Sequence, residues 1–345
     1  MTNGGVSDLI NQKLIAEKAG VSYATVSRAF TRSAKVKPET LQQIRNAMQE
    51  LGMRDFDDFF LGHNILSKMV LVVVGEIASE FFSSVISGIY EELHKKSYSI
   101  SLCISNFDSS LELQQMNMAV DNGFAGIIMI TAVETEELVS FLQTVRIPVV
   151  LVNRYIRSLD IDVVRIDNYR GGYLAARHLT ENGHRKIAFL SGPKSSSATQ
   201  DRLRGFIDAL QDQGIAFDSS HVVYGDLSRT SGRNFAEKIL SKDYTAAFIA
   251  NDDMAAGAAH YLIKVGKKIP QDISLICFDD SPIINEDGLN ITSFSCDPHL
   301  MGVSAAETLL KRLSNLLGER IRTIFSPHLN ARESVANIKE GKEDG

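Results

Sequence analysis

From Lys68 onward, short apolar runs are each followed by side chains that can form hydrogen bonds or carry charge. In a parallel sheet such side chains gather beyond the carboxyl ends of the strands, where ligands bind. Asparagine, aspartate and arginine can each bond two neighbouring polar groups, so the set suits a small polar molecule. For any single member, a turn or a helix N-cap is the more common role. The set is Glu76, Asn106, Thr131, Asn153-Arg154, Ser191, Asn251-Asp252 and Asp279-Asp280.

A second group of side chains that could bind a ligand lies near the N-terminus, on a stretch with the pattern of two short helices. The first helix stops at Gly20, which permits a tight turn, and the second begins near Ser22. Two helices joined by a short turn that contains glycine form a helix-turn-helix, whose second helix enters the major groove of DNA. The apolar face expected for the first helix consists of Ile10, Leu14, Ile15 and Ala19.

A third helix is predicted from Pro38, with Glu39 in its first turn, because both residues favour a helix start. Its apolar residues fall on one face and end before Gly52, so we expect it to pack against the other two helices. That face consists of Leu41, Ile44, Met48 and Leu51.

The charge of the chain supports a head that binds nucleic acid only after it is divided by segment. The 345 residues hold 36 Lys and Arg against 42 Asp and Glu, a formal net charge of -6 that argues against a chain basic throughout. Residues 1–54 hold eight basic and four acidic side chains, a net +4, which leaves -10 for the rest. A basic head on an acidic body is expected when one end meets a polyanion, although a solvated basic helix face gives the same pattern.

The elements that must position these groups follow from the alternation of apolar and amphipathic stretches. Short apolar runs alternate with amphipathic stretches of 10 to 15 residues, the pattern of a parallel sheet with crossover helices, in two α/β halves. A length of 345 residues and a hydrophobic fraction of 44% allow about two domains with full cores. Strands are predicted at Val70–Val74, Ile100–Ile104, Gly126–Ile130, Val149–Val152, Val163–Ile166, Ile187–Leu190, Ala247–Ala250 and Ser274–Phe278.

The sequence carries no pattern of a catalytic, metal-binding or membrane-spanning segment. It has no G-x-G-x-x-G after the first strand, no P-loop, no G-x-S-x-G and no H-E-x-x-H, so we expect neither an enzyme nor a cofactor or metal. Cys103, Cys277 and Cys296 are too far apart for a metal or redox motif, and the first two fit buried apolar positions. No apolar run reaches the 18 or so residues of a membrane span, and Met1–Ser7 has no export signal, so a cytoplasmic location is expected.

Several motifs occur in a fixed order along the chain. Residues 16–28 read A-x-x-A-G-V-S-x-x-T-V-S-R, and residues 183–193 read G-H-x-x-I-A-x-x-x-G-P. They are followed by R-x-x-G-F at 202–206, A-N-D-x-M-A at 250–255 and an x-D-D turn at 278–280. Together these motifs resemble those of the lactose repressor (LacI) family of bacterial transcription regulators, over nearly the whole chain.

The resemblance implies a small all-α helix-turn-helix headpiece and an α/β core of two doubly wound parallel-sheet subdomains, like that of periplasmic sugar-binding proteins. The expected parts are a headpiece at residues 8–54, a hinge or linker at 55–67, and an effector-binding and dimerisation core of two interleaved subdomains at 68–338. One headpiece reads half of a site, so the expected partner is a pseudo-palindromic operator bound by a homodimer.

On DNA, the resemblance assigns two kinds of contact. Tyr23, Ala24 and Arg28 fall where the family touches base edges, and an arginine can donate bidentately to guanine. Hydroxyl and amino groups nearby would contact phosphate, which fixes the register without reading sequence. These groups belong to Ser22, Thr25, Ser27, Lys37 and Thr40.

For a small effector, the resemblance implies a site between the core subdomains. Planar polar groups suit the neighbouring hydroxyls of a sugar, and the family pattern carries them over to this chain. They are Asn153, Arg202, Asn251 and Asp279. Phe81 and Phe82 fall where the family often presents an aromatic face to the ligand, although a place in a helix core is equally open.

The sequence departs from the family pattern in two places. The stretch 53–62 lacks the usual proline and carries Asp55, Asp57 and Asp58. It either turns these acids away from phosphate and inserts an apolar side chain into the minor groove, or does not insert. Cys296 stands where many members carry glutamine, as a ligand-facing thiol or a buried packing residue.

These features predict a sequence-specific DNA-binding transcription regulator, a repressor, whose operator affinity is controlled allosterically by a small sugar or sugar-like metabolite. The alternative is a sugar-binding protein of the periplasmic type without DNA binding, which predicts an export signal and no basic head. An enzyme on a doubly wound sheet is the third class, and it lacks a visible catalytic constellation.

Overall fold

The computed structural model describes residues 13–31, 36–51, 68–314 and 318–339 of the chain. The chain divides into two compact units, one built mainly on residues 1–68 and the other mainly on residues 69–345. The predicted hinge at 55–67 and its acidic residues lie outside the described residues. Among the described helices, none is long and apolar enough to cross a membrane.

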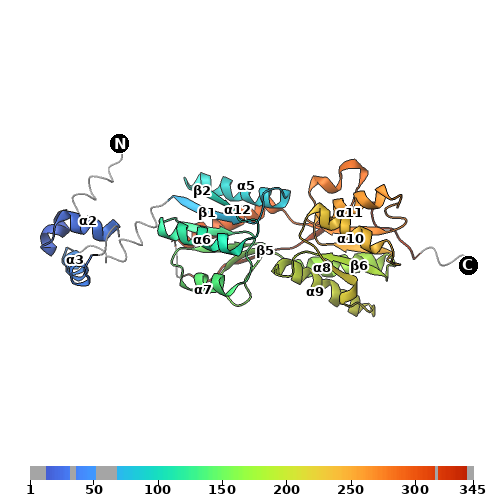
Figure 1. The fold of residues 1–345 in the computed structure, drawn as a ribbon, viewed down its shortest axis with the longest axis horizontal. Coiled ribbons are helices and arrows are strands. Elements are labelled where there is room, and N and C mark those ends of the chain that lie inside the picture. Colours follow the sequence, from blue (N-terminus) through green and yellow to red (C-terminus); the bar gives the residue numbers. More distant parts are fainter. Residues whose placement is uncertain (1–12, 32–35, 52–67, 315–317, 340–345) are drawn as a thin grey trace, which may run out of the picture. The chain divides into compact units, whose positions relative to one another are not determined.

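The described part of the N-terminal unit is helical (Figure 1). Residues 13–19 form a helix, which is followed by α2 (Tyr23–Thr31) and α3 (Pro38–Glu50). Gly20 has a φ of 65°, in the left-handed region that glycine adopts without strain, and so makes the tight turn before α2. The buried core of the unit consists of Ile15, Ala16, Val26, Ala29, Ile44 and Met48.

The three predicted helices of the head are confirmed, but one core residue is wrong. Leu14 is 44% exposed, whereas Ala16 is 6% exposed and belongs to the core. The buried face of the first helix is therefore rotated by one position from the predicted face. Ile10, the other end of the predicted face, lies outside the described residues.

The C-terminal unit holds two β-sheets with strands in non-sequential order. The strands of the first sheet are β1 (Met69–Val74), β2 (Ser99–Ile104), β3 (Gly126–Met129), β4 (Val149–Val152), β5 (Asp162–Ile166) and β11 (Arg322–Phe325). The strands of the second sheet are β6 (Ile187–Ser191), β7 (Val222–Tyr224), β8 (Ala246–Ile249), β9 (Ser274–Phe278), β10 (Thr292–Ser295) and β12 (His328–Asn330). The first sheet has the order β11-β5-β4-β3-β1-β2 and is parallel throughout. The second has the order β12-β10-β9-β8-β6-β7, with the pair β10–β12 antiparallel and the other pairs parallel.

Helices accompany each sheet and define two subdomains (Figure 1). The first subdomain contains α5 (Glu80–Lys95), α6 (Ser109–Asp121), α7 (Glu136–Thr144) and α12 (Pro298–Ser314). The second contains α8 (Asn168–Glu181), α9 (Ser197–Asp212), α10 (Arg229–Ile239) and α11 (Asp252–Lys264), with the short 3₁₀ helices η1 (Ser219–His221), η2 (Pro282–Ile284) and η3 (Glu286–Gly288). The chain passes between the subdomains after β5, after β10 and after β11, so the two are interleaved.

The eight predicted strands are all confirmed, with every end within one residue of the prediction. Four further strands were not predicted, namely β7, β10, β11 and β12. These strands are three or four residues long, and β10 and β12 carry polar residues, so no apolar run marks them.

Two glycines let helices α8 and α9 touch. A Cβ on Gly172 of α8 would lie 1.9 Å from the carbonyl oxygen of Arg202, and one on Gly205 of α9 would lie 2.0 Å from that of Tyr169. Only glycine permits this approach. The contact fixes the position of α9, and with it the position of Arg202.

Candidate functional site

The six residues predicted for effector binding all line one cavity in the cleft between the two subdomains, which we call the inner cavity. They come from separate elements: Phe81 and Phe82 from the first turn of α5, Asn153 from the end of β4, Arg202 from α9, Asn251 from the start of α11, and Asp279 from the end of β9. The inner cavity measures about 30 Å³. This is room for only one or two water molecules, so a ligand must part the walls of the cleft.

Arg202 is the most firmly held member of the site. Its side chain is buried, Nε donates to Asn168 Oδ1 at 2.7 Å, and Nη1 donates to the carbonyl of Ala250. The guanidinium carbon lies 3.7 Å from the centroid of the Phe278 ring, and Nη2 lies 3.6 Å from Asp279 Oδ1. These contacts orient the guanidinium before any ligand binds.

Asp279 is a buried acid in an unfavourable electrostatic position. Burial raises the pKa of its carboxyl to about 7, because the opposing effect of Arg202 is smaller than the desolvation and Asp252 adds repulsion. Burial also raises the pKa of Asp252, whose carboxylate accepts from the backbone N–H groups of Asp253 at 2.8 Å and Ser281 at 3.2 Å. The floor of the cleft therefore resists a second negative charge.

Several residues at the strand ends have a left-handed backbone. Asn153 has a φ of 64°, Asp279 of 85° and Asp280 of 96°, and Leu227, after β7, has a φ of 74°. Residues other than glycine seldom adopt these values, and such strain gathers at ligand-binding sites. Here it turns side chains toward the cleft.

Buried polar atoms that lack a hydrogen-bond partner mark the same place. Within the described part of the chain, these atoms are Asn153 Oδ1, Asp279 Oδ1, Arg154 Nε and Thr131 Oγ1. The first three belong to residues that line the inner cavity. Buried groups are normally paired, so this cavity presents two free acceptors and one free donor to a ligand. Burial also lowers the pKa of Arg154 to about 10.

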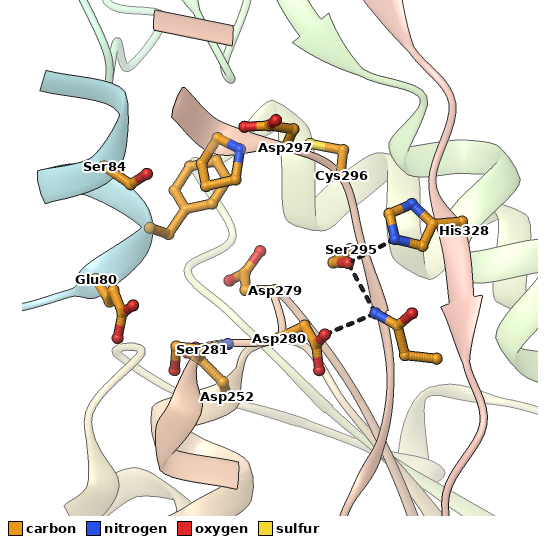
Figure 2. A pocket seen from close by; sticks show the side chains of 13 residues that line it. Glu80, Ser84, Asp252, Asp279, Asp280, Ser281, Ser295, Cys296, Asp297 and His328 are labelled. Carbon is orange, nitrogen blue, oxygen red and sulfur yellow. Dashed lines mark hydrogen bonds between the residues drawn. The ribbon is translucent and has the colours of Figure 1, made fainter. Parts of the chain in front are cut away.

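A larger cavity adjoins the inner one and shares Phe81 and Asp279 with it. This outer cavity measures about 460 Å³, within the range of small-molecule sites. Figure 2 shows Glu80 and Ser84 of α5 on one side and the acids of the second subdomain on the other. A hydrogen-bonded chain runs along its wall from His328 through Ser295 and Asn330 to Asp280.

For Phe81, Phe82 and Cys296, the sequence left open whether the side chain packs in the interior or faces a ligand. Phe81 is 8% and Phe82 4% exposed, with their rings edge to face at 5.6 Å, and both line the inner cavity. Cys296 is buried, its Sγ lies 3.3 Å from Met301 Sδ, and it also lines the outer cavity. Burial raises the pKa of this thiol to about 12, so it stays protonated. Each of these residues is both buried and part of a cavity wall.

Several residues of the cleft were not predicted from the sequence. Ser196 and Thr199 line the inner cavity, and their position just before Arg202 on α9 could have indicated them. His328 and Asn330 come from β12, which has no signal in the sequence. Some members of the polar set that follows the strands line neither cavity: Asn106, Thr131 and Ser191.

Six of the predicted DNA contacts lie on α2 or at its N-cap. Tyr23, Ala24 and Arg28 are exposed, while Thr25 and Ser27 are half-buried. Lys37 is exposed immediately before α3, and Thr40 lies half-buried in its first turn. The structure thus gathers the first six on one short helix and leaves the last two on the next helix.

Local hydrogen bonds hold this surface. Ser22 Oγ accepts from the backbone N–H of Thr25 at 3.1 Å and lies 2.8 Å from Thr25 Oγ1, so Ser22 caps α2. Arg28 Nε donates to the carbonyl of Ala24 at 3.0 Å, and its two terminal nitrogens carry the remaining four N–H donors.

Within the described residues, no group of three or more His, Cys, Asp and Glu side chains is arranged to hold a metal.

Two family models match the chain. Residues 13–54 match bacterial regulatory proteins of the lacI family, and residues 67–334 match periplasmic binding proteins and the sugar-binding domain of the LacI family. The match in residues 13–54 favours a DNA-binding regulator over a sugar-binding protein without DNA binding.

Relatives that are named as transcription regulators match most of the chain. The HTH-type transcriptional repressor PurR of Edwardsiella ictaluri is 29% identical, over 94% of this chain and 96% of its own. The structure of the transcriptional regulator CelR with cellobiose is 28% identical, with a TM-score of 0.72, over 94% of this chain and 99% of that one. A LacI family regulator from Enterococcus faecium with bound ribose is 27% identical, with a TM-score of 0.71, over 79% of this chain and 100% of that one. The chain therefore belongs to the LacI family of bacterial transcription regulators, with a helix-turn-helix head and a periplasmic-binding-protein-like core.

Proposed function

We propose that this regulator is a repressor whose affinity for operator DNA changes when a small sugar binds in the cleft between its core subdomains. One observation carries the proposal: six residues spread from position 81 to position 279 meet at one cavity that presents unpaired polar atoms. A relative of similar length is named as a repressor.

On DNA, Tyr23, Ala24 and Arg28 of α2 touch base edges, since they are exposed residues of the second helix of the helix-turn-helix. Arg28 keeps four N–H donors for guanine O6 and N7, and Ala24 offers only an apolar contact. Phosphate is contacted by Ser22, Thr25, Ser27, Lys37 and Thr40. A homodimer places two such heads on a pseudo-palindromic operator.

In the core, the effector contacts are Phe81, Phe82, Asn153, Arg202, Asn251 and Asp279. The planar side chains bond neighbouring hydroxyls of a sugar, while the Phe81 ring covers an apolar face of it. Asn251 also caps α11, because its Oδ1 accepts from the backbone N–H of Met254 at 3.2 Å. The solved relatives with cellobiose and with ribose support a sugar as the ligand class.

The three crossings between the core subdomains couple effector binding in the cleft to DNA binding by the head. A ligand larger than the inner cavity favours an arrangement of the subdomains in which the cleft is wider. That preference shifts operator affinity by the difference in ligand affinity for the two arrangements, typically about 1 to 3 kcal/mol.

The parts of the chain are a headpiece at 8–54, a hinge at 55–67 and a core at 68–338, which the matched ranges 13–54 and 67–334 support. The protein acts in the cytoplasm, where operator DNA lies, and binds its effector without catalysis. The relatives are regulators, which supports this absence of catalysis.

The test is an operator selection with random DNA, followed by fluorescence anisotropy of the selected duplex with and without sugars. We expect a pseudo-palindromic site bound in the nanomolar range at moderate salt, and a sugar that changes its affinity several-fold. Failure to select any sequence would overturn the DNA-reading part. Thermal shift with each sugar tests the core separately, because a ligand at 100 times its Kd adds about 2.7 kcal/mol of stability.

A further inference from the structure

The outer cavity is lined by carboxylates from both subdomains. Glu80 enters from α5 of the first subdomain (Figure 2). The others come from the second subdomain and from the crossing after β10: Asp252, Asp279, Asp280 and Asp297. Each ionised carboxylate offers about four acceptor sites, so five acids offer more acceptors than the hydroxyls of a small neutral sugar can fill.

Most of these carboxylates have no basic partner. Asp280 and Asp279 are the two exceptions. For Asp280, Arg332 Nη1 lies 2.7 Å from its Oδ1 and Asn330 donates to its Oδ2 at 2.6 Å. Asp279 has Arg202 Nη2 at 3.6 Å, an ion pair without a hydrogen bond. No Lys, Arg or His nitrogen in the described part of the chain lies within 4.0 Å of the remaining carboxylates, those of Glu80, Asp252 and Asp297.

The neighbouring acids extend the same field. Glu76 lines the inner cavity, and its pKa is raised first by burial and then by Asp253 and Asp226. The pKa of Asp279 is raised in the same sense. Negative charge in this cleft is therefore destabilised by its surroundings, and a positive charge would relieve it.

Two buried acceptor atoms in the cleft lack a hydrogen-bond partner, and they indicate a ligand that donates hydrogen bonds. Asp279 Oδ1 is buried without a hydrogen-bond partner, and Figure 2 shows its carboxylate projecting into the space between α5 and the second subdomain. Asn153 is 7% exposed, and its Oδ1 also lacks a partner. Asn153 Oδ1 can only accept, and Asp279 Oδ1 accepts whenever the carboxyl has lost its proton. An ammonium group supplies three N–H donors and one positive charge.

Other charged ligands fit less well. Phosphate or carboxylate on a sugar would meet the field of five acids, of which Asp279 is one. A divalent cation needs several ligands in one shell, and within the described residues no such group of side chains exists.

Resting on the sugar-binding function proposed above, we infer that the effector is an amino sugar, and that its ammonium group lies in the outer cavity between Glu80 of the first subdomain and Asp279 of the second. The sugar ring then reaches toward Arg202 and Phe81. An ammonium between carboxylates of both subdomains attracts the two walls, so this charge limits the widening of the cleft that the bulk of the ligand favours.

The experiment is isothermal titration of the full-length protein with matched compounds at pH 7. Each set contains a parent hexose, its 2-amino form, its N-acetyl form and its 6-phosphate, for the gluco, galacto and manno series. In one series we expect the amine to bind at least tenfold more tightly than the parent and the N-acetyl form, with an affinity that falls as salt rises. The 6-phosphate should bind more weakly than the parent.

Glu80→Gln tests the placement of the ammonium. Glu80 is exposed in the first turn of α5, and no hydrogen bond of its side chain is recorded among the described residues, so the variant keeps the fold. We expect the amine to lose about three- to tenfold in affinity and the neutral parent to change less than twofold. Glu136→Gln is the matched control, because Glu136 is exposed in the first turn of α7 and lines neither cavity.

The outcomes separate the inference from the proposed function. Binding of a neutral sugar with no preference for its amine overturns the inference and leaves the sugar-binding function intact. Binding of putrescine as tightly as any amino sugar supports the ammonium site and overturns the sugar as ligand class. A Glu80→Gln variant with unchanged preference for the amine overturns the placement.

Discussion

The DNA-reading surface and the effector cleft are built in opposite ways. The candidate contacts of the head fall between Ser22 and Thr40, are mostly exposed, and are held by hydrogen bonds within a few residues of sequence. The cleft residues come from three helices and the ends of two strands, spread between positions 81 and 279, and they are mostly buried. A change in the head should therefore act locally on DNA binding, whereas a change in the cleft should alter ligand affinity and core stability together.

The two regions also differ in charge. The head presents positive side chains to solvent, where water screens them, while in the cleft the Arg202 side chain is 5% and the Asp279 side chain 14% exposed. Electrostatic effects should thus be modest in the head and large in the cleft.

The largest effect is expected from Arg202→Ala. The change removes the guanidinium held by Asn168 and Ala250, and truncating a buried, hydrogen-bonded charge costs about 2 to 5 kcal/mol. Effector affinity should fall at least a hundredfold, measured by titration calorimetry, while operator binding without effector is kept. Arg204→Ala is the control, since Arg204 is an exposed residue of the same helix. Unchanged effector affinity in Arg202→Ala would remove this residue from the site.

The pH dependence of stability is the next effect in size. The carboxyl of Asp279 has a pKa of about 7 in the folded protein, above the ordinary value of 3.8 for aspartate, so the folded state keeps a proton that the unfolded state has lost. Stability without ligand should fall as pH rises from about 4 to 7, by up to about 1.4 kcal/mol per pH unit. Thermal unfolding of Asp279→Asn between pH 5 and pH 8 should show a flatter profile.

The charged groups around Asp279 determine how the pH profile of the Asp279→Asn variant is interpreted. Arg202 lowers the pKa of its carboxyl, whereas Asp252 and Asp253 raise it. Burial raises the pKa of Asp252 as well, so a residual slope in the variant reports on that residue. A profile of Asp279→Asn parallel to that of the wild type would contradict the assignment.

In the head, Arg28→Ala should cost about 1 to 3 kcal/mol at one base pair of the operator and relax the preference there. Effector affinity should not change. Anisotropy with operators altered at each position measures this effect. Lys37→Ala is the contrasting variant, because loss of a phosphate contact weakens binding to all sequences and reduces the salt slope by about one. Equal losses on all sequences for Arg28→Ala would show that it contacts phosphate.

The smallest effect is expected from Ser22→Ala. Loss of the N-cap bond to Thr25 should lower the stability of the head by about 1 kcal/mol, visible in its thermal unfolding. Ser228→Ala, which removes the corresponding cap of α10 in the core, should leave the head unchanged. Ser22→Asp keeps a cap but adds a negative charge, so DNA affinity should fall while stability is retained. If Ser22→Asp binds DNA as well as the wild type, Ser22 is not close to phosphate.

Particular residues show which parts of the fold the periodicity of apolar residues can predict. The run Val70–Val74 and most of its counterparts are buried on both faces of a parallel sheet, so continuous apolar sequence marks them. The edge strand β2 is the exception, with Leu102 and Ile104 exposed. His328–Asn330 forms a strand only because it returns beside β10, a long-range pairing without local signal. Leu14 and Ala16 are both apolar neighbours of the helical face, and only the packing of α2 and α3 decides which is buried.

The candidate effector site also has a part that could be predicted from the sequence and a part that could not. The resemblance to the family indicated six of the residues that line the inner cavity, and the identity of the side chains that follow the strands suggested a polar ligand. The outer cavity was not predictable, because its wall joins the first turn of α5 to residues after β9 and β10 and to β12, which are far apart in sequence.

The sequence by itself determined the helix-turn-helix, the alternation of strands and helices, and the division of charge between a basic head and an acidic body, because each depends on neighbours within one or two turns of chain. Only the tertiary structure decided which acids share a cavity and which lack a partner. Desolvation and the distances between Glu80, Asp279 and Arg202 arise from burial and topology, and no local pattern encodes them.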